Sequence, residues 1–392
     1  MIETCTAPLV PEVIPLKPQG ASQTLKPNLI GMTRSQMEKA LIEIDTDPKA
    51  LKMRANQLWS WIYQKGFTDF SLMSNLSKDY RSKLSNNFHL RRPKLLKKEL
   101  GSDGTTKFLL ELYDGNKIET VYIPEKNRGT VCISSQVGCT LNCSFCHTGT
   151  QKLVRNLSSE EIVNQILFVK DELSDWSTLK NQLNVKRLIS NIVIMGMGEP
   201  LYNFESVRDA LKIVMDCEGV SISKRKITLS TSGVVPNIVK VGEEIGCLLA
   251  ISFHATTDEV RDKLVPINKK WNIDKLLNTL KSYPTLSNTA RITFEYVMLR
   301  DVNDSDEDAK RLVQLISGIP AKINLIPFNP WPGTKYKGSS STRISSFSRI
   351  VNNAGYSSPI RHPRGLDIMA ACGQLKSASK PVKRLKEVKI NG

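Results

Sequence analysis

The chain has 392 residues, and its 55 lysines and arginines against 38 acids give it a formal charge of +17. With 40% hydrophobic residues it is long and apolar enough to bury a sizeable core, which excludes a disordered protein. No apolar run approaches the roughly 18 residues of a membrane-spanning helix, and Met1–Gly20 lacks the pattern of a signal peptide. We therefore expect a cytoplasmic protein with no membrane partner.

The N-terminal part of the chain predicts a flexible extension followed by a small helical unit. Residues 1–30 contain five prolines and little periodicity, which is typical of a flexible segment. A first helix is expected after Thr33, because Thr33 and Gln36 have the spacing of a capping box. Helical patterns follow at Leu51–Lys65 and Ser77–Ser85.

The positive charge is concentrated in two segments. Lys78–Lys98 holds eight basic residues against one acid, and the tail Lys376–Gly392 holds six against one. Either segment could contact the phosphates of a nucleic acid, or form an ordinary solvated surface. For Lys78–Lys98 both interpretations stay open, whereas the tail is interpreted as solvated chain.

In the middle of the chain the helical patterns give way to strand patterns. Thr106–Leu112 and Lys117–Ile123 alternate apolar and polar residues around Asp114–Gly115, which predicts a β-hairpin. From about residue 130, six strand patterns alternate with helical patterns, which predicts a parallel α/β sheet or an open barrel with its chemistry at the carboxyl ends of the strands. The predicted strands are Val131–Val137, Asn191–Met195, Lys226–Leu229, Cys247–Phe253, Arg291–Leu299 and Lys322–Phe328, and the predicted helices are Ser158–Glu172, Glu205–Asp216, Val235–Ile245, Ile273–Tyr283 and Ser305–Ser317.

Three cysteines follow the first of these strands with the spacing C-x3-C-x2-C. Thiolates of Cys139, Cys143 and Cys146 could surround one soft-metal centre. Zinc usually takes four ligands, and His147 is an awkward fourth because it directly follows Cys146. A [4Fe–4S] cluster normally takes four cysteines, so with three it keeps one iron open to a small molecule.

This spacing resembles the signature of radical S-adenosylmethionine (SAM) enzymes, which share a partial (β/α)6 barrel. The resemblance implies that the three cysteines hold one [4Fe–4S] cluster and that SAM binds its open iron. In this superfamily a stretch like Met195–Pro200 holds the SAM amino group, which gives that role to Gly198 and Glu199. Small polar groups at strand ends suit a bound nucleoside-amino acid, although His254 could equally be a satisfied histidine at the barrel rim. The further SAM-binding candidates are Ser230, Ser252, Phe253, His254 and Asn329.

A closer resemblance is carried by several motifs together. Ser134–Cys139, Leu229–Gly233 and Ala371–Leu375, with the strand ends above, resemble the RlmN/Cfr family of radical SAM RNA methyltransferases. Arg54–Trp59 and Thr68–Phe70 resemble the small helical domain of its RlmN branch. The resemblance covers roughly residues 33–375. It implies methylation of adenosine C2 in 23S ribosomal RNA, at the peptidyl transferase centre, and in transfer RNA next to the anticodon.

The resemblance also implies a ping-pong mechanism that uses two SAM molecules per turnover. Adenine C2 has no lone pair to attack a methyl donor, so a pair of thiols could serve as methyl carrier and resolving partner. Cys372 would accept a methyl group from one SAM, and a radical derived from a second SAM would activate the resulting thioether. Cys132 would then attack Cys372, release the product and leave a disulfide, while Glu119 would take the proton from C2. The electron donor would be flavodoxin-like or ferredoxin-like, and the enzyme a monomer.

Two alternatives remain from sequence. One is Cfr-like methylation of adenine C8 in 23S ribosomal RNA, and the other is a non-catalytic iron–sulfur or zinc protein that binds RNA. The expected organisation is a flexible extension (1–30), a helical RNA-binding accessory domain (31–98), a hairpin linker (99–130), a radical SAM barrel (131–375) and a basic tail (376–392). We interpret Asp175–Val185 as a surface insertion.

Overall fold

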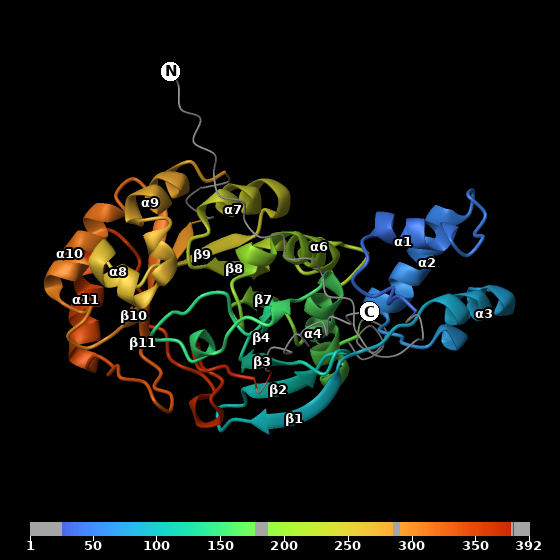
Figure 1. The fold of residues 1–392 in the computed structure, drawn as a ribbon, viewed down its shortest axis with the longest axis horizontal. Coiled ribbons are helices and arrows are strands. Elements are labelled where there is room, and N and C mark those ends of the chain that lie inside the picture. The colour runs from blue at the N-terminus through green and yellow to red at the C-terminus, as the bar shows by residue number, and fades with distance from the viewer. Residues whose placement is uncertain (1–25, 177–186, 285–290, 378, 380–392) are drawn as a thin grey trace, which may run out of the picture.

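One open, curved sheet organises the molecule (Figure 1). The computed structural model describes residues 26–176, 187–284, 291–377 and 379. Six strands, β4 and β7 to β11, run parallel, whereas β1 to β4 pair antiparallel at one side of the sheet. In spatial order the strands are β1 (Lys94–Leu100), β2 (Thr106–Glu111), β3 (Lys117–Glu125), β4 (Arg128–Cys132), β7 (Asn191–Ile194), β8 (Ile227–Thr231), β9 (Leu248–Ser252), β10 (Ile292–Met298) and β11 (Ala321–Pro327). The predicted partial barrel is confirmed.

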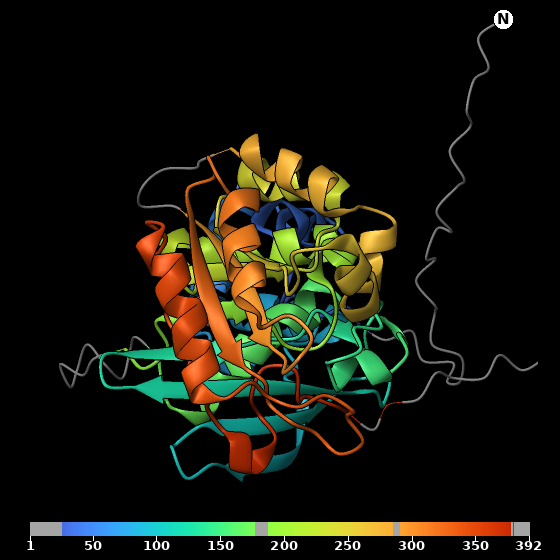
Figure 2. The same ribbon diagram turned by 90° about the vertical axis from the view of Figure 1, so that its left-hand side faces the viewer.

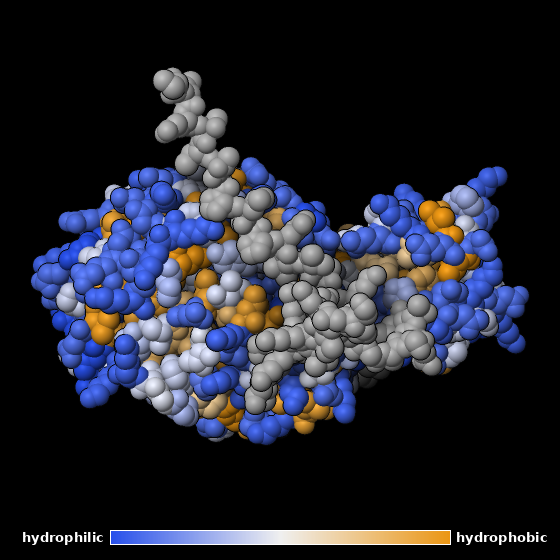
Figure 3. Space-filling model, viewed as in Figure 1, coloured by the Kyte–Doolittle hydropathy of each residue, from blue (hydrophilic) through white to orange (hydrophobic). Residues whose placement is uncertain are grey.

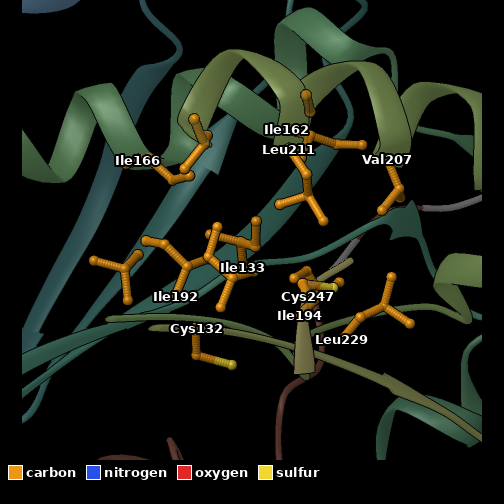
Figure 4. Packing of buried hydrophobic residues seen from close by; sticks show 14 of the residues in the cluster. Cys132, Ile133, Ile162, Ile166, Ile192, Ile194, Val207, Leu211, Leu229 and Cys247 are labelled. Atoms are coloured by element: carbon orange, nitrogen blue, oxygen red, sulfur yellow. The ribbon is translucent and has the colours of Figure 1, made fainter. Parts of the chain in front are cut away.

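Helices cover the outer face of the parallel strands (Figure 2). Ile133 and Ile192 on the sheet face Ile166 and Leu211 on the covering helices α4 and α6 (Figure 4). Burying one such side chain stabilises the fold by about 1.5–3 kcal/mol. Successive residues alternate between the two faces of a strand, so Cys132 points to the opposite side, into the barrel (Figure 4). The barrel helices are α4 (Ser159–Glu172), α6 (Phe204–Met215), α7 (Val235–Lys240), α8 (Asp258–Leu264), α9 (Ile273–Lys281), α10 (Asp306–Leu315) and α11 (Ser341–Asn353).

Three short helices form a lobe beside the barrel (Figure 1). They are α1 (Arg34–Ile42), α2 (Leu51–Trp59) and α3 (Lys78–Asn87). The predicted capping box is present, because the Thr33 side chain accepts from the Gln36 N–H and the Gln36 side chain accepts from the Thr33 N–H. Polar contacts attach the lobe to the barrel helices: Asn28 donates to Glu160 at 2.6 Å, and Arg34 pairs with Asp216 at 3.0 Å.

Several elements differ from those expected. The strand predicted at Val131–Val137 ends at Cys132. The buried Ser134 bonds outside the strand ladder, because its N–H donates to Gln165 Oε1 and its hydroxyl to Glu119 O. The chain then forms the short strand β5 (Gln136–Val137), which pairs with β6 (Arg155–Asn156). Strand β1 and helices α8 and α11 were not expected from sequence.

The hairpin β2–β3 extends the barrel sheet, because β3 pairs with β4. No helix in the described parts of the chain is long and apolar enough to cross a membrane. Residues 1–25 of the expected extension, residues 177–186, which include most of the expected insertion, and nearly all of the expected basic tail lie outside the described residues.

Candidate active site

A pocket opens at the carboxyl ends of the parallel strands, where the sequence predicts the chemistry. Its space amounts to about 1070 Å³, including the part open to solvent. Most of the predicted site residues line it, namely Cys139, Cys143, Cys146, Gly198, Glu199, Ser230, Ser252, His254, Asn329 and Cys372.

The loop that carries the three cysteines is tightly folded between β5 and β6. Cys146 N–H donates to Cys143 O at 3.1 Å, and a Cβ at Gly149 would lie 2.6 Å from that same oxygen. Burial raises the pKa of all three thiols, that of Cys139 to about 12, and neighbouring negative charges raise the pKa of Cys139 and Cys143 further. Cationic iron would supply the charge that thiolates in this buried loop need.

The three thiols fit a cluster better than a single ion. Among the described residues, no group of three His, Cys, Asp or Glu side chains is arranged to hold one metal ion. In a [4Fe–4S] cluster each cysteine binds a different iron, so the thiols need only surround a common space. All three line the same pocket.

The turn after β7 presents a buried carboxylate. Glu199 accepts hydrogen bonds from the N–H groups of Leu201 (3.0 Å) and Ser232 (2.8 Å), and burial raises its pKa to about 7. Gly198 has φ +99°, and a Cβ there would lie 2.5 Å from the Gln136 side chain. Glycine is therefore required to let this turn pack closely, and the carboxylate is available to hold an ammonium group.

The next strand ends add polar groups. Ser230 Oγ and Ser252 Oγ lie 3.5 Å apart. His254 has a left-handed backbone (φ +61°), and its Nδ1 accepts from Val297 N–H at 3.1 Å, so the neutral ring carries its proton on Nε2. Burial lowers the pKa of His254 to about 3, so the ring stays neutral. Phe253 is the exception among the predicted SAM residues, because its side chain packs against Phe294 and does not line the pocket.

A fully buried arginine, not singled out from sequence, joins two of these strand ends. The Arg261 guanidinium donates to Ser232 O (2.8 Å), to Ser252 O (3.1 Å) and, through Nε, to Phe253 O (3.0 Å). Asn268 Oδ1 accepts its remaining bond at 2.8 Å. Arg261 therefore fixes the spacing between the ends of β8 and β9.

Replacing Arg261 by methionine is expected to destabilise the fold by about 3 kcal/mol or more, because buried carbonyl oxygens lose their donor and each costs about 1–3 kcal/mol. The free energy of unfolding, measured in urea, checks this. Arg225→Met, at an exposed position, serves as the matched control and should unfold like the native protein. An Arg261→Met variant with native stability would show that the guanidinium contacts are dispensable.

The segment that carries Cys372 lies against the cluster loop. Asn329 Nδ2 donates to Cys372 O at 3.1 Å, and His147 N–H donates to Gly373 O at 2.7 Å. The Cys372 side chain is accessible through the pocket, yet the protein atoms around it and the charge of Glu295 raise its thiol pKa to about 11. Glu295 is a buried carboxylate that also lines the pocket. An acid within the apolar strand Ile292–Met298 was the signal for it in the sequence.

Two predicted catalytic residues lie outside the pocket lining. The buried Cys132 thiol ends β4, and negative charge on Cys372 raises its pKa beyond the effect of burial, so the two thiols are electrostatic neighbours. Both cysteines are free. Glu119 lies on β3, where it contacts Lys107 and the backbone of Lys376. The structure thus brings Cys132 near Cys372 and holds Glu119 to one side.

Comparisons with known proteins agree over nearly the whole chain. A family model for the ribosomal RNA large subunit methyltransferase N-terminal domain matches residues 27–90, and the radical SAM superfamily model matches residues 133–313. Proteins named dual-specificity RNA methyltransferase RlmN are 60% identical over 373 residues in Paracoccus denitrificans (95% of each chain) and 59% identical over 382 residues in Dinoroseobacter shibae (97% of each). A crystal structure of a radical SAM methyltransferase from Sphaerobacter thermophilus, 36% identical, matches with a TM-score of 0.80 over 89% of this chain and 99% of that one.

Proposed function

Because the chain belongs to the RlmN family of dual-specificity RNA methyltransferases, within the radical SAM superfamily, we propose that it methylates adenosine at C2, in 23S ribosomal RNA at the peptidyl transferase centre and in transfer RNA next to the anticodon. It is a radical SAM enzyme that methylates adenine in ribosomal and transfer RNA. One observation carries the proposal: Cys372 shares a pocket with three cysteines in radical SAM spacing and with polar groups at consecutive strand ends.

The enzyme uses a [4Fe–4S] cluster and SAM, which together supply a carbon-centred radical. We propose that Cys139, Cys143 and Cys146 hold the cluster. The buried carboxylate of Glu199 would hold the SAM ammonium group next to Gly198. The other SAM contacts would come from the pocket-lining residues Ser230, Ser252, His254 and Asn329. Phe253 would act only through packing beneath the strand end, since Phe294 contacts its ring.

The two remaining thiols divide the work of carrying and releasing the methyl group. Cys372 takes up a methyl group on its sulfur and loses its proton. The adduct of the activated methyl carbon with adenine C2 loses one electron, which the cluster would take back. Cys132, as a thiolate, then attacks Cys372 Sγ, so that the sulfur–carbon bond breaks as a disulfide forms and the released methylene carbon takes up a proton to become the methyl group. Glu119 accepts the proton from C2, and an external reductant regenerates both thiols. The electrostatic coupling of Cys132 to Cys372 supports this pairing.

Identification of the methylated nucleoside tests the site of modification. After anaerobic reaction with 23S ribosomal RNA fragments and transfer RNA, the RNA is digested and its nucleosides are compared with standards by mass spectrometry. We expect 2-methyladenosine from both RNAs. Formation of 8-methyladenosine would instead assign the enzyme to the Cfr-like alternative.

We further propose that residues 31–98 act as an RNA-binding accessory domain, joined through residues 99–130 to the barrel. The helical lobe stands beside the barrel, and hydrophilic residues cover most of its visible surface (Figure 3), which supports this role. We also propose that the enzyme works as a monomer in the cytoplasm with a flavodoxin-like or ferredoxin-like electron donor.

The basic segment Lys78–Lys98 is less uniform than its composition indicates. Arg92 is only 11% exposed and pairs with Asp171 at 2.7 Å, so it attaches the lobe to α4. Lys98 pairs with Glu172 at 2.9 Å. Lys78, Lys83 and Arg91 are exposed and have no ion-pair partner among the described residues. At these three cations no carboxylate in the described parts of the chain competes with a phosphate.

Charge reversal of Lys78, Lys83 and Arg91 to glutamate is expected to weaken RNA binding and to reduce the slope of log affinity against log salt by about 0.7–0.9 per lost phosphate contact. Titration of transfer RNA at several salt concentrations measures both. The matched control reverses the exposed Lys269, Lys275 and Lys281. Two of them belong to α9, which lies at the opposite end of the molecule from the helical lobe (Figure 1). Equal salt slopes for the two triple variants would return Lys78–Lys98 to an ordinary solvated surface.

A further inference from the structure

A nearly buried lysine links the first three strands to the segment that carries Cys372. Lys107, on β2, has a side chain that is only 8% exposed. Its Nζ lies 3.2 Å from Glu119 Oε1 on β3 and 3.3 Å from Glu99 Oε2 on β1. Nζ also donates to Met369 O at 3.5 Å, three residues before Cys372. In both ribbon views the C-terminal segment lies beside these strands (Figures 1 and 2).

Lys107 is the cation that favours the ionised form of Glu119. Burial raises the pKa of Glu119, and the charge of Glu99 raises it further. The ammonium group of Lys107 and the N–H of Lys376, which donates to Glu119 Oε2 at 2.7 Å, both lower it. These are the charged and hydrogen-bonding groups that face the carboxylate from β1, from β2 and from the C-terminal segment.

We propose that Lys107 is a positioning residue for methyl transfer, which keeps Glu119 ionised and ties its carboxylate to the segment of Cys372. The inference rests on the proposed role of Glu119 as proton acceptor. A base must start the step without its proton, and a carboxylate buried beside Glu99 alone would hold one. Lys107 therefore makes the carboxylate available, and its bond to Met369 O sets where the carboxylate lies relative to Cys372.

The same contacts let Glu119 return its proton. Once Glu119 has accepted the proton it is neutral, and Lys107 keeps Glu99 as its remaining counterion. The neighbouring ammonium group makes neutral Glu119 a stronger acid, so loss of its proton to water is favoured before the next turnover. An ordinary structural ion pair would also favour ionised Glu119, but its loss would not shift the pH dependence of methyl transfer, and this difference can be measured.

The experiment compares Lys107→Met, Lys107→Arg, Glu119→Gln and the control Lys126→Met, which alters an exposed lysine in the β3–β4 turn. Enzyme already methylated on Cys372 reacts once with transfer RNA between pH 6 and 9.5, and the rate of product formation is followed. An infrared measurement of the protonated carboxyl band, taken as the difference between Lys107→Met and Lys107→Met/Glu119→Gln, reports the ionisation of Glu119 without turnover.

Loss of the cation is expected to move the acidic limb of the pH–rate profile by at least about one pH unit towards alkaline pH, because an opposite charge at this distance lowers a carboxyl pKa by about 1–3 units. At a fixed pH on the acidic side of that limb, Lys107→Met is therefore expected to react about tenfold or more slowly than the native enzyme. Lys107→Arg should restore the native limb, and Lys126→Met should not move it.

Two results would overturn the inference, and they differ. If Glu119→Gln abolishes product formation while Lys107→Met keeps the native pH profile and infrared band, Lys107 does not position the base, and the role of Glu119 stands. If Glu119→Gln reacts like the native enzyme, the proposed proton acceptor is wrong and Lys107 has no base to position.

Discussion

Replacing Cys372 by alanine is expected to abolish RNA methylation, with a loss of at least about 10⁴-fold in rate, comparable to removal of a nucleophile in other covalent enzymes. The reason is that no other described thiol can substitute. Cys139, Cys143 and Cys146 are committed to the cluster in the proposed mechanism, and the buried Cys132 does not line the pocket. Intact-protein mass spectrometry after incubation with SAM should therefore show methylated native enzyme and unmethylated Cys372→Ala.

Cys217→Ala is the matched control, because this cysteine is also exposed but does not line the pocket. It should be methylated and active like the native enzyme. If Cys372→Ala took up a methyl group and passed it to RNA, the carrier would be another residue, and the ping-pong mechanism would need a different pair of thiols.

Replacing Cys132 by alanine has a different expected result: the enzyme should stop after one turnover with RNA covalently attached to Cys372. The first methyl uptake does not involve Cys132, so it should proceed at the native rate. Without the resolving thiol, the bond between Cys372 and the methylene carbon on the base persists, because the thiolate that would break it is missing. Denaturing gels with labelled RNA should show a protein–RNA band that nuclease shortens.

The matched control for Cys132→Ala is the loss of another buried thiol that has no proposed role in the reaction. Cys247 is buried like Cys132 and immediately precedes a barrel strand, but it does not line the pocket. Cys247→Ala should release methylated RNA over many turnovers without accumulating a covalent complex. Repeated release of free product by Cys132→Ala would refute the resolving role.

Much of the fold was predictable because its signals are local. The six parallel strands and their main helices follow from apolar periodicity, and the capping boxes at Thr33 and Ser158 mark two helix starts that the structure has. Strand β1 was missed because Lys-Leu-Leu-Lys-Lys-Glu-Leu does not alternate, and its pairing with β2 provides what its sequence lacks. The strand expected at Val131–Val137 is interrupted, because the backbone N–H of Ser134 donates to the buried Gln165 side chain instead of to a neighbouring strand.

In the site, too, residues with local sequence signals were predictable and residues defined by long-range contacts were not. The cluster cysteines lie within eight residues, and Gly198 and Glu199 follow a strand directly, so sequence alone indicated them. The roles of Arg261 and Lys107 could not be predicted from sequence, because they depend on contacts between elements that are distant along the chain. Arg261 bonds carbonyl groups at two strand ends, and Lys107 meets a carboxylate 12 residues along the chain and a carbonyl 262 residues away. No spacing rule anticipates such contacts.

One labelling measurement tests the central claim, that the methyl group reaches adenine C2 through Cys372. The enzyme is first incubated with SAM carrying a deuterated methyl group, then freed of SAM and mixed with unlabelled SAM and RNA for a single turnover. The proposed mechanism predicts that the first product is deuterium-labelled 2-methyladenosine, since its carbon was already on the protein. Unlabelled product in the first turnover, or a label at C8, would contradict it.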